Sequence, residues 1–587
     1  MKYIKKILVF ILFVSCSNMN ENKNMEFNQV LEDYFQESLY LYKIDGTFQG
    51  DSRYNDTLPN FLSDEFVNKE KLFYNKYLKK INSFENSILN EEDLLSKNVL
   101  KWECEMNLDR MKFPTDLMPV DQMWGFQLTM GQLASGMGAQ PFNNFKDYKN
   151  WLVRIDGYLD WLKSAKIKMQ EGMKTGWVLP KSLIKKVLPQ LKVMTNEDVE
   201  NHLFYKPVTS FPNLIEEDER EILIAEYYDM VKNKIIPAYS DLYNFMSNEY
   251  FDSGRETSGY SSLNGGKEYY DYAIKYYTTT NLTPNEIHEL GLKEVKRIRS
   301  EMIKIKKNVG FEGSLDDFFE HVRNLKELMP FDKPEQVIDN FNSIHEKMLP
   351  YVNNLFELQP KTKFEVRRTE AFREASAAAQ YNPGSLDGTR PGIFYVPIPN
   401  VKKYNTYSDE DLFLHEAIPG HHYQISLQQE NELLPSFRKD LWYSSYGEGW
   451  ALYAESLGSE LGLYKDPYQY FGMLSAEIHR AIRLVVDTGI HSKGWSREKA
   501  IEYSLNNEAE SKESIISEIE RYMANPGQAL SYKIGQLKIQ ELRDNAQKVL
   551  GEKFDIKVFH RKILESGCIP LQLLEQKIVN WINYEKG

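Results

Sequence analysis

The sequence predicts a mainly α-helical protein with a small stretch of β-structure beside a metal-binding helix. Segments 61–84 and 150–176 repeat apolar residues at three- and four-residue spacing with charged residues between them, which is the period of an amphipathic helix. The 37 tyrosines, 31 phenylalanines and 9 tryptophans can fill a large core and line a cleft. Three of the 10 histidines fall within positions 415–422, where we expect a metal site.

The N-terminus has the pattern of an export signal. Three lysines occur among the first six residues and an apolar run covers residues 7–14, which is too short to span a bilayer as a mature helix. Ser15 before Cys16 resembles the cleavage box of a bacterial lipoprotein; an ordinary signal with an incidental cysteine is the alternative. We expect residues 1–15 to be a lipoprotein signal peptide, Cys16 to carry the lipid, and residues 16–27 to form a flexible tether.

Two later helical segments carry their own start and bend signals. The amphipathic pattern of residues 213–246 contains Pro237, so we expect a long helix that bends there. Thr283 can cap a helix that starts at Pro284, and Glu286 can close a capping box with Thr283. Local chemistry therefore predicts where these helices begin and where one of them bends.

The Gly- and Ser-rich segment 251–266 is typical of a loop or hinge. No repeat of fixed period and no low-complexity linker divides the rest of the chain. We expect a single helical domain over residues 28–587, which a hinge at 251–266 would separate into two lobes.

One short run favours β-structure. Residues 393–396 (IFYV) are β-branched or aromatic and follow a series of turn residues. Prolines on both sides of this run cannot donate ladder hydrogen bonds, so we expect an edge strand. An edge strand can pair with an extended peptide. The candidate substrate contacts in this region are Tyr381, Asn382 and Tyr395.

Charge and cysteine content narrow the classes of partner and metal ligand. A net charge of −13 argues against nucleic acid, which favours a basic surface. Apart from Cys16, the chain has Cys104 and Cys568, whose spacing indicates no thiolate metal site. A bound metal must therefore be held by nitrogen and oxygen.

The segment HEAIPGHHYQ is a modified zinc-peptidase motif. In H-E-x-x-H the second histidine follows four residues after the first, so that both share one face of a helix, but position 419 is a proline here. On a regular helix, His421 would point about 120° away from His415, and His422 would lie roughly 10 Å along the axis. Because Pro419 and Gly420 disrupt regular helix, a two-residue bulge between Ile418 and His421 can bring His415 and His421 together. His422 is the alternative second ligand.

A third ligand is expected from the helical stretch SSYGEGWALYAE. Helical zinc peptidases often use a glutamate from the next helix, which favours Glu448, 27 residues after His421. Glu455 lies two turns further along, so we expect it to orient a ligand histidine or to meet a substrate amine. The alternative is that both glutamates form a solvated helix face.

Three protein ligands leave a fourth position open to water, as in catalytic zinc sites. Glu416, beside the first ligand, is then placed to accept a proton from that water and to pass it to the leaving amine. We expect one Zn²⁺ ion, although Mn²⁺ or Co²⁺ also suits nitrogen and oxygen ligands.

Four motifs in order, HEAIPGHHYQ, GEGWALYAE, RLVVDTGIHSKGW and PGQALSYKIG, resemble the bacterial proteins grouped as domain of unknown function 885, many of which are lipoproteins. The resemblance runs from about Asn28 to near the C-terminus. This family is more remotely similar to helical zinc peptidases of the thimet oligopeptidase and thermostable carboxypeptidase type. The resemblance implies a large helical bowl or clam with a deep channel. The peptidase motif lacks the inserted residues, so only His415 and Glu416 align directly.

The later motifs suggest further roles. Arg483 or Arg480 could meet the C-terminal carboxylate of a peptide, His491 could bind the oxyanion, and Asp487 could support the site from behind. A buried Arg–Asp pair and a capping histidine are the alternatives.

Tyr532 is similar to the tyrosine that helical zinc peptidases place late in the chain to donate a hydrogen bond to the oxyanion. A tyrosine packed in the core is the alternative. Arg521 is a further candidate contact for substrate.

Together these features predict a zinc-dependent hydrolase of short peptides, either an oligopeptidase or a carboxypeptidase. A confined channel would exclude folded proteins. We expect the protein to be lipid-anchored in the cell envelope, on the periplasmic or outer-membrane surface. One alternative is a non-catalytic lipoprotein that binds peptides or glycans on the same scaffold; another is a metal-dependent hydrolase of a different amide or ester.

Overall fold

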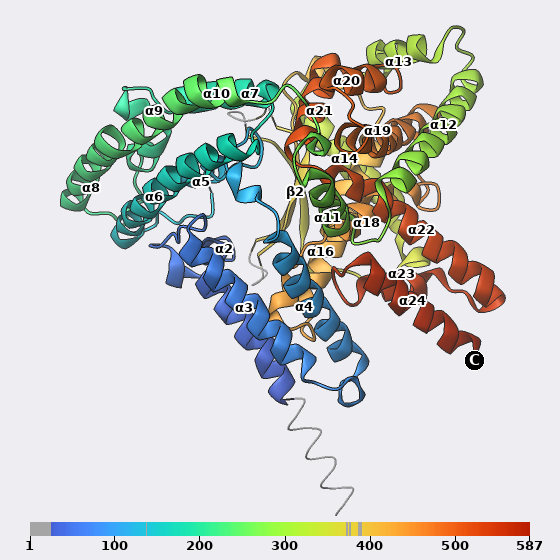
Figure 1. Cartoon of the computed structure of the whole chain (residues 1–587). Coiled ribbons are helices and arrows are strands. Elements are labelled where there is room, and N and C mark those ends of the chain that lie inside the picture. The colour runs from blue at the N-terminus through green and yellow to red at the C-terminus, as the bar shows by residue number, and fades with distance from the viewer. Residues whose placement is uncertain (1–24, 137, 371–373, 375–376, 386–389) are drawn as a thin grey trace, which may run out of the picture. The chain divides into compact units, whose positions relative to one another are not determined.

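The chain is mainly helical with one small three-stranded sheet, as the sequence predicts (Figure 1). The computed structural model describes residues 25–136, 138–370, 374, 377–385 and 390–587. The predicted signal peptide and Cys16 lie outside the described residues. Among the described residues, no helix combines the length and the apolar character needed to cross a bilayer.

The predicted tether ends earlier than expected. Residues 25–41 are almost entirely helical, and Phe27 is fully buried. Its ring packs edge-on against Phe84, with 5.3 Å between the ring centroids. The tether prediction is therefore wrong for residues 25–27, because an aromatic side chain that is distant in sequence covers Phe27.

Contacts divide the chain into two compact units. The first comprises the described residues up to Leu89 together with Leu100–Tyr269, and the second comprises Asn90–Val99 and Tyr270–Gly587. The segment predicted as a hinge, 251–266, lies within the first unit. The prediction of a single domain with two lobes stays a prediction.

The first unit is built around one long helix, α6. Asn144 caps its start, and Gly176 ends it with a left-handed φ of 82°. Its buried face includes Trp151, Tyr158 and Trp161. The helices of this unit are α2 (Lys43–Phe48), α3 (Asp64–Asn82), α5 (Phe126–Ala134), α6 (Phe145–Thr175), α7 (Lys181–Val193), α8 (Glu217–Met230), α9 (Ile236–Phe245) and α10 (Phe251–Ser253), and α4 (Glu91–Arg110) belongs to both units.

The helix is irregular just before Pro237, where we predicted a bend. A π-helical turn over Val231–Ile235 joins α8 to α9, and Pro237 lies in the first turn of α9. Proline lacks an N–H, so the regular hydrogen-bond ladder cannot continue through it.

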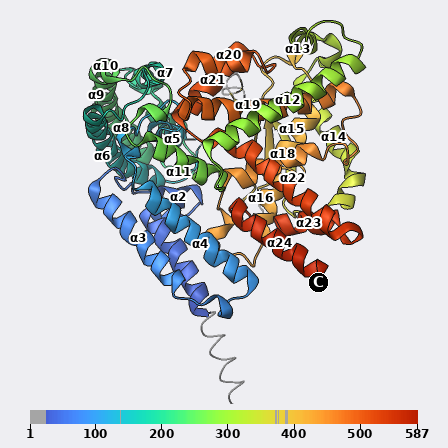
Figure 2. The ribbon, with the colours of Figure 1, turned by 45° about the vertical axis from the view of Figure 1, so that its right-hand side comes forward.

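The second unit contains two close helix pairs. α12 runs beside α19, and α18 packs against α22 (Figures 1 and 2). Thr283 and Glu286 form the predicted capping box at the start of α12. The helices of this unit are α12 (Pro284–Asn308), α13 (Leu315–Asn324), α14 (Pro334–Leu355), α15 (Asp409–Glu416), α16 (His421–Glu430), α17 (Ser436–Lys439), α18 (Ser444–Ser456), α19 (Pro467–His491), α20 (Arg497–Leu505), α21 (Lys512–Ala524), α22 (Ser531–Leu550), α23 (Ile556–Leu564) and α24 (Leu571–Lys586), and α11 (Gly266–Thr278) has residues in both units.

The sheet has the strand order β1-β3-β2. β3 (Gly392–Val396) pairs in parallel with β1 (Phe364–Arg368) and antiparallel with β2 (Gln380–Asn382). β3 is therefore the central strand, and the prediction that it forms an edge is wrong. The flanking prolines lie just outside the paired residues, so they remove no ladder hydrogen bond.

Candidate metal centre

The HEAIPGHHYQ segment forms two helices with a break between them. α15 ends at Glu416 and α16 begins at His421, so the chain breaks the helix completely where we predicted a bulge within it. At the break, a Cβ on Gly420 would lie 1.9 Å from the carbonyl oxygen of His415, so only glycine fits. The indole N–H of Trp450 donates to the carbonyl of Pro419 at 2.8 Å and holds the connection in place.

Three side chains converge at this break. Glu448 Oε2 lies 3.6 Å from His415 Nε2 and 3.5 Å from His421 Nε2. The three potential ligand atoms all lie within 4.8 Å of one another. Ligands of a tetrahedral zinc ion lie about 3.3–3.5 Å apart, given bonds of about 2.0–2.2 Å. The donor set and its spacing therefore fit one divalent ion.

The ligand atoms are well shielded from solvent. The side chains of His415, His421 and Glu448 are 7%, 12% and 15% exposed. The centroids of the two imidazole rings are 4.7 Å apart, and the rings are nearly perpendicular at 85°. Both rings present Nε2 to the same carboxylate oxygen.

Glu455 contacts the Nδ1 atom of His415, the ring nitrogen that is not directed at Glu448. Its Oε1 lies 2.6 Å from His415 Nδ1, and its side chain is 2% exposed. A carboxylate on Nδ1 fixes the ring so that Nε2 faces Glu448. This is the position expected of a residue that orients a ligand histidine.

The cluster favours positive charge. Burial lowers the pKa of His415, but hydrogen bonds to Glu448 and Glu455 outweigh burial and raise that pKa to about 10. Burial also disfavours the ionised form of Glu448, yet His421 and His415 outweigh it and hold the pKa of Glu448 well below its usual range. The carboxylates therefore create a buried site that attracts a cation.

Glu416 lies beside the first ligand and is held by the sheet. Its Oε2 accepts a hydrogen bond of 2.9 Å from the backbone N–H of Tyr381 in β2. Burial raises the pKa of Glu416, which is the direction that suits a general base at neutral pH. The β2 strand thus positions the side chain of Glu416, which we predict to move the proton.

His422 points away from the cluster. Its Nδ1 pairs with the hydroxyl of Tyr381 at 3.0 Å and with Ser426 Oγ at 3.3 Å. Burial lowers the pKa of His422 to about 4. The structure favours His421 over His422 as the second ligand. His422 instead contacts Tyr381 of the β2 strand.

The other substrate candidates of the sheet lie on its opposite face. Tyr381 is paired with Phe394, so the two share a face, and strand residues alternate. Asn382 and Tyr395 therefore face away from Tyr381 and His422. Their predicted contacts with substrate stay predictions.

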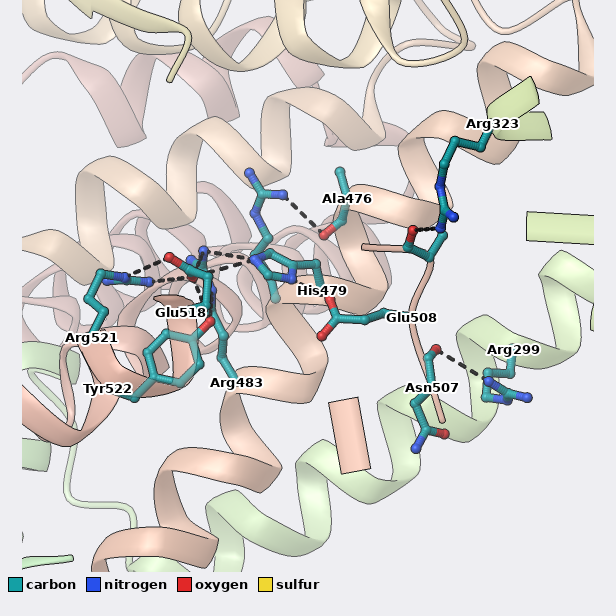
Figure 3. A network of polar contacts seen from close by, with 12 residues as sticks. Arg299, Arg323, Ala476, His479, Arg483, Asn507, Glu508, Glu518, Arg521 and Tyr522 are labelled. Atoms are coloured by element: carbon teal, nitrogen blue, oxygen red, sulfur yellow. Dashed lines mark hydrogen bonds and ion pairs between the residues drawn. The ribbon is translucent and has the colours of Figure 1, made fainter. Parts of the chain in front are cut away.

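Arg483 and Arg521 share a carboxylate that sequence reasoning missed. Arg483 in α19 donates to Glu518 Oε2 at 2.9 Å and to the hydroxyl of Tyr522 at 3.0 Å. Arg521 donates to both oxygens of Glu518 at 2.9 Å. Figure 3 shows both guanidinium groups turned toward Glu518. Glu518 thus binds Arg483 and Arg521, which we predicted to contact substrate.

Tyr532 packs against this ion network. The guanidinium of Arg483 lies over its ring, 4.5 Å from the centroid. Burial raises the pKa of the Tyr532 hydroxyl, and the nearby Glu448 carboxylate raises it further. The hydroxyl is therefore a protonated hydrogen-bond donor at neutral pH.

His491 and Asp487 have packing roles instead of the predicted catalytic and supporting ones. His491 is fully buried; its Nε2 pairs with the carbonyl oxygen of Tyr522 at 2.9 Å, and its ring lies against Tyr270. Asp487 accepts a hydrogen bond of 2.6 Å from the Tyr270 hydroxyl. Burial raises the pKa of Asp487 to about 7. Both residues join α19 to neighbouring segments of the core.

Two residues near the cluster carried no signal in the sequence. Asp411 lies one helical turn before His415, and burial together with Glu455 raises its pKa well above the usual value. Trp442 lies beside His421, with 5.7 Å between the ring centroids. Neither forms part of a motif. Asp411 shares a face of α15 with His415 through their four-residue spacing, whereas only packing brings Trp442 beside His421.

The fold and the cluster define a mainly helical protein with a candidate three-ligand metal centre. The family model described as "Bacterial protein of unknown function (DUF885)" matches residues 44–578, which is most of the chain. The chain therefore belongs to the DUF885 family. No curated protein matches it.

Two solved structures are similar to nearly the whole chain. A candidate lipoprotein from Colwellia psychrerythraea is 26% identical with a TM-score of 0.87, and the match covers 95% of this chain and 99% of that one. A candidate lipoprotein of unknown function from Shewanella oneidensis is 18% identical with a TM-score of 0.76, and the match covers 94% and 99%. The second likeness concerns the fold alone.

Proposed function

We propose that the chain is a metal-dependent peptidase that hydrolyses short peptides in the cell envelope. The observation that carries the proposal is the convergence of His415, His421 and Glu448 next to Glu416. A structural metal site needs no proton acceptor, and catalytic zinc sites characteristically have three protein ligands and one open position.

The residues present fit the requirements of peptide hydrolysis. Bound Zn²⁺ would lower the pKa of water to about 7 and polarise the scissile carbonyl. Glu416, fixed by the N–H of Tyr381, accepts the proton of the attacking water and returns it to the leaving amine. The hydroxyl of Tyr532 donates a hydrogen bond to the developing oxyanion. Glu455 keeps the His415 ring in a fixed orientation during the reaction.

The cell-envelope location rests on two observations. The N-terminal pattern ending at Cys16 is that of a lipoprotein signal. The Colwellia psychrerythraea relative, which matches 95% of the chain, is described as a candidate lipoprotein. A lipid on Cys16 would anchor the enzyme to a membrane while the described residues stay outside the bilayer.

The proposal is tested by digestion of a mixed peptide library followed by mass spectrometry. We expect cleavage by the metal-loaded protein, loss of cleavage with a chelator, and recovery when zinc is restored. Glu416→Gln, which preserves shape but removes the base, should bind metal normally and cleave at least about a hundredfold more slowly. Cleavage that survives chelation, or full activity of Glu416→Gln, would overturn the proposal. Ladders trimmed from one end would also show which terminus is attacked.

A further inference from the structure

Trp442 presents an exposed indole beside the candidate metal centre. Its side chain is 43% exposed, although its ring centroid lies 5.7 Å from that of His421. The indole also lies directly against Gly447, where a Cβ would come within 2.1 Å of its Cη2. Gly447 immediately precedes the ligand Glu448. The indole therefore forms a wall that touches two of the three ligand-bearing segments.

The backbone on both sides of Trp442 is fixed by buried groups. The carbonyl of Leu441 accepts a hydrogen bond of 2.9 Å from Gln428 Nε2. The N–H of Tyr443 donates to Cys568 Sγ at 3.1 Å. Gln428 and Cys568 are themselves buried and joined by a hydrogen bond. The backbone that carries the indole is thus held in place before any ligand arrives, which lowers the entropic cost of binding against it.

A flat and exposed aromatic surface suits an apolar partner. Burying a large apolar side chain against it removes nonpolar area from water, and aromatic partners gain additional stacking energy. Consecutive Cα atoms are about 3.8 Å apart. Only residues that flank the scissile bond can therefore reach a ring this close to His421 while their carbonyl lies at the metal.

We propose that Trp442 forms one wall of a subsite that selects peptides with an aromatic or large aliphatic side chain next to the scissile bond. This inference rests on the proposed peptidase function and deepens it by naming the substrate class. The same surface offers little to glycine or serine, which have no apolar side chain to cover it.

The kinetic test uses pentapeptides of alanine with one variable position, occupied in turn by Phe, Leu, Ser or Gly at each of the five places. At one place we expect kcat/KM for Phe and Leu to exceed that for Gly by about tenfold or more. Trp442→Ala should reduce this ratio to less than about threefold, while Trp442→Phe keeps most of it. Leu433→Ala removes an apolar side chain that is 85% exposed elsewhere in the same loop region and should leave the ratio unchanged.

A binding experiment separates the subsite from the catalytic proposal. The Glu416→Gln protein, loaded with zinc, is titrated calorimetrically with the Phe and Gly peptides, with and without Trp442→Ala. A Trp442-dependent preference in binding, with no hydrolysis by the wild type, would support the subsite and overturn the peptidase. Hydrolysis whose preference is unchanged in Trp442→Ala, or a uniform loss for all peptides, would overturn the subsite and leave the peptidase standing. Absence of both binding and hydrolysis would overturn both.

Discussion

Removing the charge of Glu455 should weaken zinc binding without touching any metal ligand. Glu455 Oε1 lies 2.6 Å from His415 Nδ1, and its side chain is 2% exposed. In Glu455→Gln the amide oxygen can still accept from Nδ1, but the negative charge that makes the imidazole a stronger ligand is lost. In Glu455→Ala both the charge and the hydrogen bond are lost.

The expected magnitude follows from this geometry. A buried hydrogen bond to a charged group contributes about 1.5–3 kcal/mol, and each 1.4 kcal/mol corresponds to about tenfold in an equilibrium constant. We therefore expect the Kd for Zn²⁺ to rise about tenfold in Glu455→Gln and about a hundredfold in Glu455→Ala. The same range holds for outer partners of metal-binding histidines in general.

The assay is a competition titration of the apo protein with zinc in the presence of a chelating indicator. Glu460→Gln is the matched control, because Glu460 is in the same region but forms an exposed ion pair with Arg543 at 3.0 Å. That variant should bind zinc as the wild type does. Thermal unfolding of each variant verifies that it is folded. An unchanged zinc Kd in both Glu455 variants would refute the role assigned to Glu455 and the assumption that His415 binds metal through Nε2.

Three further predictions follow from the same contacts. His421→Ala should lose zinc by elemental analysis while His422→Ala retains it, and the reverse result would show that the wrong histidine is assigned as ligand. Tyr532→Phe should lower kcat for peptide hydrolysis by about a hundredfold or more with little change in KM; an equal effect on both constants would argue against a role in the transition state. Burial raises the pKa of Asp487 to about 7, so the folded state retains a proton that the unfolded state loses near pH 4. Its contribution to stability is therefore complete below about pH 4 and declines as pH rises towards 7. In denaturant titrations across this range, Asp487→Asn should show less of this decline than the wild type, and identical profiles would contradict the assignment.

Local sequence signals predicted helices well where a few adjacent residues determine the outcome. The capping box of Thr283 and Glu286 and the helix irregularity just before Pro237 are examples, because each depends on contacts within one or two turns. Phe27 was misassigned to a tether because its partner, Phe84, is far away in the sequence. The central position of β3 was missed because β1 and β2 lacked clear strand patterns of their own.

The site was predictable only in part, because some of its contacts join residues that are far apart in the sequence. Pro419 and Gly420 indicated that the backbone departs from a regular helix, which is why His415 and His421 could be paired from sequence. By contrast, Arg483, Asp487 and His491 lie on successive turns of α19. Periodicity places them on one face, but it does not indicate which turn lies near Tyr532 and which packs against Tyr270. That distinction depends on the packing of α11, α21 and α22 around α19.

The central claim is that one metal ion binds between the two helices of the HEAIPGHHYQ segment and α18. The most direct measurement is anomalous X-ray diffraction at the zinc edge from crystals grown with Zn²⁺. We predict a single strong peak within about 2.0–2.2 Å of His415 Nε2, His421 Nε2 and a Glu448 carboxylate oxygen. A fully zinc-saturated crystal with no peak at these three atoms, or with its peak at His422 or elsewhere, would contradict the account.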